Sequence, residues 1–309
     1  MFYYRVSPEY NLAVINYIRG RLLFLDTYNI YKDINARTQG EIYIGVVGPV
    51  RSGKSTFIKH FAEKLILPFM DEGAGKERTK DELPQSAAGR TVMTTEPKFI
   101  PREACTITPA EDLSMKIRLI DCVGFMIDGA TGVVEEGKER LVKTPWYDYE
   151  IPFSEAAEFG TRKVIKDHST VGIVMTTDGS IGELPRDSYR AAEKTAIDEL
   201  KKIGKPFVVV VNSKSPASKT ASDCVDEIKK SYDTEAVSID CEKLTLADVN
   251  RTLELLLNSF PINGMEFYFD KWIETLPDDN EIKQAMLECA GQLLEKITYI
   301  KDFNKDALK

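Results

Sequence analysis

Apolar runs that are typical of buried strands alternate with amphipathic helical patterns along most of the chain. A dense apolar run at 41–47 predicts a buried central strand, and the helical pattern at 55–67 ends before Pro68. This alternation predicts an α/β fold with a mainly parallel sheet flanked by helices. Further strands are predicted at 104–108, 116–121, 171–176, 207–212 and 236–239. Further helices are predicted at 26–37, 154–167, 186–203, 217–232 and 246–260.

Other segments depart from this alternation. Residues 71–89 are charged, hold three glycines and lack periodicity, so an exposed loop is predicted there. Residues 125–149 form a long, mostly polar insertion. After Pro261 the pattern changes, and a strand at 264–272 and an amphipathic helix at 279–297 are expected.

These changes predict three parts in the chain. Residues 1–25 form an N-terminal extension, and residues 26–262 form the α/β domain. Residues 263–309 are the start of a second small α+β region.

The strongest chemical signal lies between the first predicted strand of the sheet and the helix that follows it. Residues 48–55 have the sequence Gly-Pro-Val-Arg-Ser-Gly-Lys-Ser, a full match to G-x-x-x-x-G-K-[ST]. The glycines let backbone N–H groups turn inward around an anion, and the helix adds its positive N-terminal end. In such a loop Lys54 reaches the β- and γ-phosphates and Ser55 binds Mg2+. A chance glycine turn is the alternative, but the strand before and the helix after favour a phosphate loop. The nucleotide-binding candidates here are Gly48, Arg51, Ser52, Gly53, Lys54, Ser55 and Thr56.

Two further elements complete a phosphate site of this kind. Asp121 ends a predicted strand and begins Asp-Cys-Val-Gly, the D-x-x-G form of a switch whose Gly124 N–H contacts the γ-phosphate while the carboxylate holds Mg2+. A strand-end aspartate that caps a turn is the alternative. The third element is a threonine from the intervening loop, where Thr94 and Thr95 both qualify and Thr95 is the candidate metal ligand.

The order of these motifs resembles the Ras-like branch of P-loop NTPases, which usually recognises guanine through Asn-Lys-x-Asp after a later strand. Here the matching residues are Asn212-Ser-Lys-Ser215, so Asn212 is retained and Ser215 replaces the aspartate. A hydroxyl does not replace a carboxylate that accepts from two guanine N–H groups at once, which favours ATP over GTP. Phe125 stands where many relatives use a glutamine to orient water, so we expect slow hydrolysis or a contribution from elsewhere, such as another copy. The strand end at Thr176-Thr-Asp178 is a further place where α/β ligand sites gather.

Composition limits the partners. Lys and Arg number 41 against 49 Asp and Glu, a net charge of −8 that argues against nucleic-acid binding. The apolar runs near the N-terminus are too short to cross a bilayer, so no transmembrane segment is expected. Five cysteines without a CxxC pair predict free thiols in a reducing cytoplasm, and two isolated histidines give no zinc site.

Beyond these motifs, the chain resembles the stage IV sporulation protein A family over about 26–261. The resemblance lies in residues 45–56, 81–89, 94–99, 118–124, 144–147, 151–153, 160–165 and 176–179. It implies an ATPase of endospore-forming bacteria that hydrolyses ATP with Mg2+ and self-assembles into a polymer on the forespore surface, the base for spore coat assembly. The family's phosphate-loop lysine falls on Lys54, its magnesium-holding aspartate on Asp121, and its sensor threonine on Thr94 or Thr95.

The resemblance also implies a place and partners. The place is the mother-cell cytoplasm, at the outer forespore membrane. The partners are the protein itself, spore coat proteins and stage V sporulation protein M. Family members carry middle and C-terminal regions, so residues 263–309 would be the beginning of a truncated middle domain. The alternatives are a GTP-type regulatory switch and a nucleotide-holding structural protein without turnover.

Overall fold

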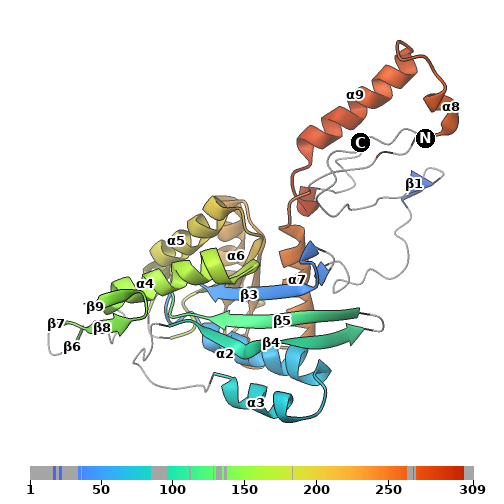
Figure 1. Ribbon diagram of the computed structural model, residues 1–309. Coiled ribbons are helices and arrows are strands. Elements are labelled where there is room, and N and C mark those ends of the chain that lie inside the picture. The colour runs from blue at the N-terminus through green and yellow to red at the C-terminus, as the bar shows by residue number, and fades with distance from the viewer. Residues whose placement is uncertain are drawn as a thin grey trace.

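A computed structural model of the chain describes residues 17–18, 21–22, 34–35, 37–84, 96–110, 113–127, 129, 134–135, 138–182, 184–262, 267 and 269–302. Its centre is a six-stranded sheet in the order β12-β11-β10-β3-β5-β4 (Figure 1). Neighbouring strands are parallel except β4, which pairs antiparallel with β5 at one edge. The predicted α/β fold with a mainly parallel sheet is confirmed. The strands are β3 (Glu41–Val47), β4 (Lys98–Ala110), β5 (Leu113–Asp121), β10 (Val171–Thr177), β11 (Phe207–Asn212) and β12 (Ala236–Ile239).

Helices cover both faces of this sheet. The main helices are α2 (Lys54–Phe61), α3 (Ala74–Glu82), α4 (Phe153–Lys163), α5 (Asp187–Ile203), α6 (Lys219–Tyr232), α7 (Leu246–Asn258), α8 (Lys271–Glu274) and α9 (Glu281–Lys296). Helix α2 continues through a π-helical turn (Ala62–Ile66) into a 3-10 turn (Leu67–Phe69), and α4 through a π-helical turn (Val164–His168). In the part of the chain that the structure describes, no helix is long and apolar enough to cross a bilayer.

Alternating side chains of the central strands fill two cores. On β11, Val208 and Val210 pack with α2 and α7 on one face, whereas Val209 and Val211 pack with α5 and α6 on the other. Because both faces are covered, the strand is continuously apolar, as buried parallel strands are. Because β3, β5, β10 and β11 are parallel, their carboxyl ends lie together at one end of the sheet. We call this end the carboxyl edge, and the candidate site lies there.

A short hairpin stands beside α4 at one end of the molecule (Figure 1). It is formed by β8 (Leu141–Thr144) and β9 (Tyr147–Pro152) within and just after the predicted polar insertion. Its turn packs on α4, since the ring of Phe159 lies 5.1 Å from that of Trp146. The structure also has two-residue strand pairs, β1 (Tyr17–Ile18) with β2 (Arg21–Leu22) and β6 (Val134–Glu135) with β7 (Lys138–Glu139).

The prediction of an exposed loop at 71–89 is wrong over its first half, because α3 lies there. This helix has no apolar stripe to reveal it. It is supported by polar contacts instead: Lys76 pairs with Glu72 at 2.6 Å, and the carboxylate of Glu82 accepts a hydrogen bond of 2.8 Å from the Arg102 N–H of β4.

The predicted strand at 264–272 is also wrong where the structure describes it. Residues 267 and 269–270 are not in a strand, and Lys271 and Trp272 begin α8. Ile273 in this helical turn is buried. The amphipathic helix predicted at 279–297 is confirmed as α9, whereas most of the predicted extension 1–25 and of the helix at 26–37 lies outside the described residues.

Candidate nucleotide site

The phosphate loop joins β3 to α2 at the carboxyl edge of the sheet. Gly48 and Gly53 have φ of 122° and 93°, in the region that favours glycine. A Cβ on Gly48 would lie 2.2 Å from the carbonyl oxygen of Met175, and one on Gly53 would lie 2.2 Å from Nδ2 of Asn212. Both glycines of the motif are therefore required by close contacts as well as by backbone conformation.

Lys54 lies under the loop as the first residue of α2. Its Nζ donates to the carbonyl of Pro49 at 2.6 Å and to that of Gly48 at 3.5 Å, and only 5% of the residue is exposed. Burial lowers the pKa of Lys54, although the nearby Cys122 and Asp121 act in the opposite direction. The carbonyl groups of Gly48 and Pro49 thus hold the ammonium group inside the phosphate loop, at the position from which it would contact a bound phosphate.

Asp121 and Ser55 meet beside the loop, as the motif predicts. The Ser55 hydroxyl donates to Oδ2 of Asp121 at 2.7 Å, while Oδ1 of Asp121 is buried and has no hydrogen-bond partner among the residues that the structure describes. Burial raises the pKa of Asp121, and the hydrogen bond from Ser55 partly offsets this. A buried carboxylate oxygen without a partner next to a hydroxyl fits a hard cation, and these are oxygen ligands of the kind that Mg2+ uses.

The segment after Asp121, residues 122–125, lies directly against the phosphate loop; we call it the switch segment. Phe125 N–H donates to the Gly48 carbonyl at 3.0 Å, and Val50 N–H donates to the Phe125 carbonyl at 2.9 Å. Gly124 has φ of 101°, and a Cβ there would lie 2.2 Å from the Gly48 oxygen. The Phe125 ring is buried, so this residue packs in the core and leaves no polar group to orient water.

Asn212 supports the phosphate loop from behind. Its Nδ2 donates to the carbonyl of Ser52 at 3.1 Å, and its Oδ1 accepts from the Cys241 N–H at 3.2 Å. Asn212 therefore holds the phosphate loop in place, and its predicted contact with the nucleotide stays a prediction.

The loop after β11 is fixed by a buried carboxylate. Asp178 accepts from the Ser213 hydroxyl at 2.6 Å and from the N–H and hydroxyl of Ser180 at 2.9 and 2.5 Å. Burial alone raises the pKa of Asp178, but the hydrogen bonds from Ser180 and Ser213 outweigh it and hold this pKa below its usual value. Ser213 also accepts from the Ser215 N–H at 3.1 Å. Ser213, in the lysine position of the guanine motif, is therefore turned into the protein.

The structure brings together most of the predicted site residues. Those at the carboxyl edge are Gly48, Arg51, Ser52, Gly53, Lys54, Ser55, Thr56, Asp121, Gly124 and Asn212. Thr94 and Thr95 lie outside the described residues. Asp178 was predictable from its strand end. Thr161 lies in the family-like stretch 160–165, but no motif assigns it a role; its hydroxyl accepts the Gly124 N–H at 3.1 Å.

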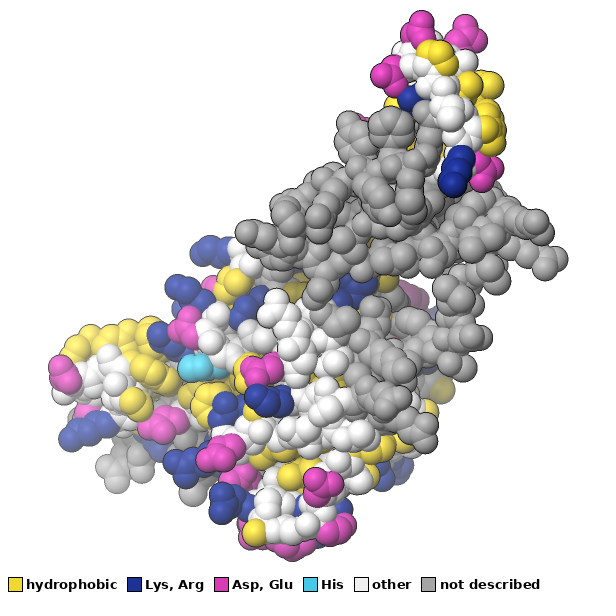
Figure 2. Space-filling model, turned by 45° about the vertical axis from the view of Figure 1, so that its right-hand side comes forward, with side chains coloured by type: hydrophobic (Ala, Val, Ile, Leu, Met, Phe, Trp, Pro, Cys, Tyr) yellow, Lys and Arg dark blue, Asp and Glu magenta, His cyan; other side chains and the backbone are white. Residues whose placement is uncertain are grey.

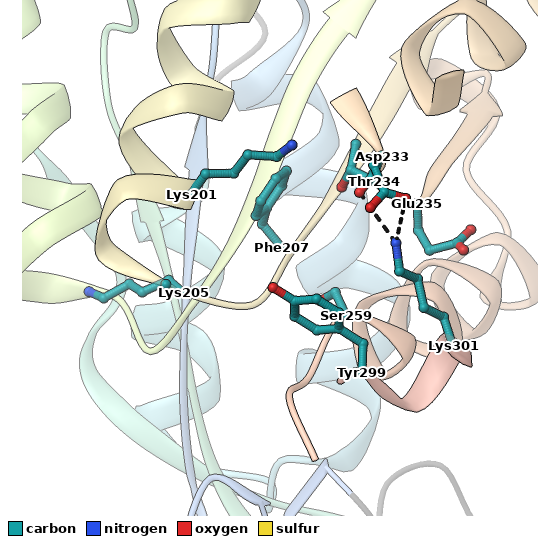
Figure 3. Close-up of a pocket in the computed structure, with 10 residues that line it drawn as sticks. Lys201, Lys205, Phe207, Asp233, Thr234, Glu235, Ser259, Tyr299 and Lys301 are labelled. Atoms are coloured by element: carbon teal, nitrogen blue, oxygen red, sulfur yellow. Dashed lines mark hydrogen bonds and ion pairs between the residues drawn. The ribbon is translucent and has the colours of Figure 1, made fainter. Parts of the chain in front are cut away.

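A separate cavity of about 230 Å³ lies at the opposite edge of the sheet, near the start of β11 (Figure 3). Its lysines are bonded within the protein. Lys301 pairs with Asp233 at 2.8 Å, Lys201 donates to the Tyr232 carbonyl, and Lys205 donates to three carbonyls, among them that of Ile165 at 2.6 Å. The cavity lies where the segment after α9 contacts the residues that precede β11 and β12.

The phosphate loop between β3 and α2, with Asp121 at the end of the adjacent strand, defines a P-loop nucleoside triphosphatase domain. The family model of the stage IV sporulation protein A ATPase domain matches residues 25–261. The chain therefore belongs to the stage IV sporulation protein A family.

Relatives named stage IV sporulation protein A agree with this assignment. The protein of Clostridioides difficile (strain 630) is 45% identical over 274 residues, which cover 89% of this chain and 56% of the relative. Those of Bacillus anthracis and Bacillus subtilis (strain 168) are 43% and 42% identical over 281 residues, covering 91% of this chain and 57% of each relative. The chain thus spans a little over half the length of these relatives. A solved structure titled "crystal structure of SsGBP and GDP complex" superposes with a TM-score of 0.39 at 16% identity, covering 69% of this chain and 48% of that one.

Proposed function

We propose that this chain binds and hydrolyses ATP with Mg2+ and is the nucleotide-binding unit of a morphogenetic protein that self-assembles. The observation that carries the proposal is the contact of Ser55 with Asp121 beside the buried Lys54. A lysine for the phosphates and two oxygen ligands for a cation lie together there, as phosphoryl transfer to water requires.

The residues divide the chemistry among them. Inward backbone N–H groups of the phosphate loop bind the phosphates, and Lys54 orients the β- and γ-phosphates. Ser55 and Asp121 would hold Mg2+, and the cation neutralises charge that develops on the γ-phosphate. Phe125 is buried and apolar and does not orient the attacking water, so we expect slow turnover or a water-orienting group from elsewhere, such as another copy.

The loop after β11, at the place where Ras-like proteins recognise guanine, favours ATP over GTP. Ser213 is fully buried and bonded to Asp178, so it does not stack on a base, and Ser215 lacks the carboxylate that accepts guanine's two N–H groups. A site that lacks a partner for a polar base group discriminates against that base, because the group is left unpaired. Asn212 and the switch segment are shared with GTP-type switches, so GTP is the nucleotide to compare.

The family supplies the biological setting of the proposal. The chain would act in the mother-cell cytoplasm at the outer forespore membrane, polymerise with itself and serve as the base for spore coat assembly. Its further partners would be spore coat proteins and stage V sporulation protein M, with no nucleic acid. Among the residues that are coloured in Figure 2, basic and acidic side chains are interspersed and form no basic patch of the kind that binds phosphate backbones.

Phosphate release from ATP and from GTP, at several protein concentrations and with Lys54→Ala as the control, tests this function. ATP turnover that needs Lys54 and rises more than linearly with concentration supports an assembly-coupled ATPase. Turnover of GTP in preference to ATP supports a GTP-type switch instead, and equal turnover removes the specificity argument for either nucleotide. Nucleotide binding without any turnover supports a nucleotide-holding structural protein.

A further inference from the structure

The switch segment is held from a second side, by α4. The Gly124 N–H donates to Oγ1 of Thr161 at 3.1 Å. Thr161 is fully buried, and its hydroxyl proton goes to the Ala157 carbonyl one turn earlier at 2.8 Å. The hydroxyl oxygen is therefore free to accept, and the Gly124 amide is its partner.

A γ-phosphate bound in the phosphate loop would be a second acceptor for the same Gly124 N–H. A Cβ on Gly124 would lie 2.6 Å from Nζ of Lys54, so this glycine is next to the ammonium that binds the phosphates. In a D-x-x-G switch the glycine N–H donates to the γ-phosphate. One N–H makes one strong hydrogen bond, so the two acceptors compete.

We propose that Thr161 is a positioning residue that competes with the γ-phosphate for the Gly124 N–H, so that nucleotide binding releases α4 from the switch segment. The proposal rests on the proposed function, because it needs a nucleoside triphosphate in the phosphate loop. Nothing in the phosphate-loop motif itself specifies this contact, which joins residues 37 positions apart.

Helix α4 links the switch segment to the hairpin β8–β9. The neighbouring Arg162 places its guanidinium 5.9 Å from the Phe125 ring centroid, so two consecutive residues of α4 contact the switch segment. Two residues before Thr161 on the same helix, Phe159 packs on Trp146 and, at 5.4 Å, on Tyr147. Through Phe159, a movement of α4 would reach the hairpin β8–β9.

The hairpin β8–β9 exposes apolar side chains, which an assembling protein could use to contact another molecule. Leu141 and Tyr149 are 56% and 64% exposed. Figure 2 shows hydrophobic side chains gathered at this end of the molecule. Movement of α4 would change how this apolar surface is presented as the nucleotide changes.

Equilibrium binding of ATPγS and of ADP to the full chain tests the proposal, with Thr161→Val as the variant and Thr161→Ser as the matched control. Valine keeps the shape of threonine but accepts no hydrogen bond, so the buried Gly124 N–H loses its partner in the nucleotide-free protein. Binding a γ-phosphate restores a partner. The affinity for ATPγS is therefore expected to rise by about fivefold or more. ADP affinity and the Thr161→Ser variant stay at wild-type values.

The outcomes separate this proposal from the proposed function. Wild-type chain that binds neither nucleotide overturns both. If wild type binds both nucleotides, and Thr161→Val changes the affinities for ATPγS and ADP equally or not at all, only the role of Thr161 is overturned. If Thr161→Val does not fold, the emission of Trp146 in a Trp272→Phe background tests the coupling: a change with ATPγS and none with ADP supports it, and equal responses overturn it.

Discussion

Replacement of Asn212 by alanine tests whether the phosphate loop is held in shape from behind. The side chain makes two buried hydrogen bonds, to the Ser52 carbonyl at 3.1 Å and from the Cys241 N–H at 3.2 Å. Alanine removes both and leaves the Cys241 N–H without a partner in a fully buried position.

The expected magnitude follows from these two contacts. A neutral hydrogen bond contributes about 0.5–1.5 kcal/mol net, and a buried donor left unmade costs about 1–3 kcal/mol. The free energy of unfolding of Asn212→Ala should therefore fall by about 2–4 kcal/mol. If the bond to Ser52 contributes about 1 kcal/mol to the binding shape of the loop, ATP affinity falls about fivefold.

Urea unfolding and equilibrium ATP binding measure the two effects separately. Asn258→Ala is the matched control, because Asn258 lies half-buried at the end of α7 and its side chain makes no hydrogen bond within the described part of the chain. An Asn212→Ala protein as stable as this control, with unchanged ATP affinity, would refute the view that Asn212 supports the loop.

Two further predictions concern ionisation. Since hydrogen bonds hold the pKa of Asp178 below its usual value despite burial, its stabilisation is present above the unfolded pKa near 4 and is lost as the pH falls through the folded pKa. The stability advantage of wild type over Asp178→Asn, measured by urea unfolding, should shrink as the pH falls from about 5 to below about 3, and an advantage that stays constant would contradict this. Burial raises the pKa of Cys122 to about 11 and also raises that of Cys241, whereas Cys289 is exposed. At about pH 8 iodoacetamide should label Cys289 first in the folded chain, as followed by mass spectrometry, and equal labelling of Cys122 would contradict the packing described.

The sheet was predictable because its strands are buried on both faces. The runs at 41–47 and 236–239 match β3 and β12 to the residue, since continuous apolar runs between turn residues have few alternatives. Helix α3 was not predictable from periodicity, because it buries only Thr79 and is supported by ion pairs and by Glu82.

The site was predictable where one local motif supplies it and not where distant segments meet. The phosphate loop and its lysine lie within eight consecutive residues, so the motif alone located them. The bond between Asn212 and Ser52 joins residues 160 positions apart, and the roles of these residues depend on how the sheet brings strand ends together. The same holds for Thr161, which only the packing of α4 places beside Gly124.

Calorimetric titration of ATP into wild type and Lys54→Ala, each with and without Mg2+, tests the central claim most directly. Wild type should bind ATP more tightly with Mg2+, because Ser55 and the buried carboxylate of Asp121 would hold the cation beside the phosphates. Lys54→Ala should remain folded and lose this binding. Equal ATP affinity of the two proteins would contradict the assignment of this edge of the sheet as the nucleotide site.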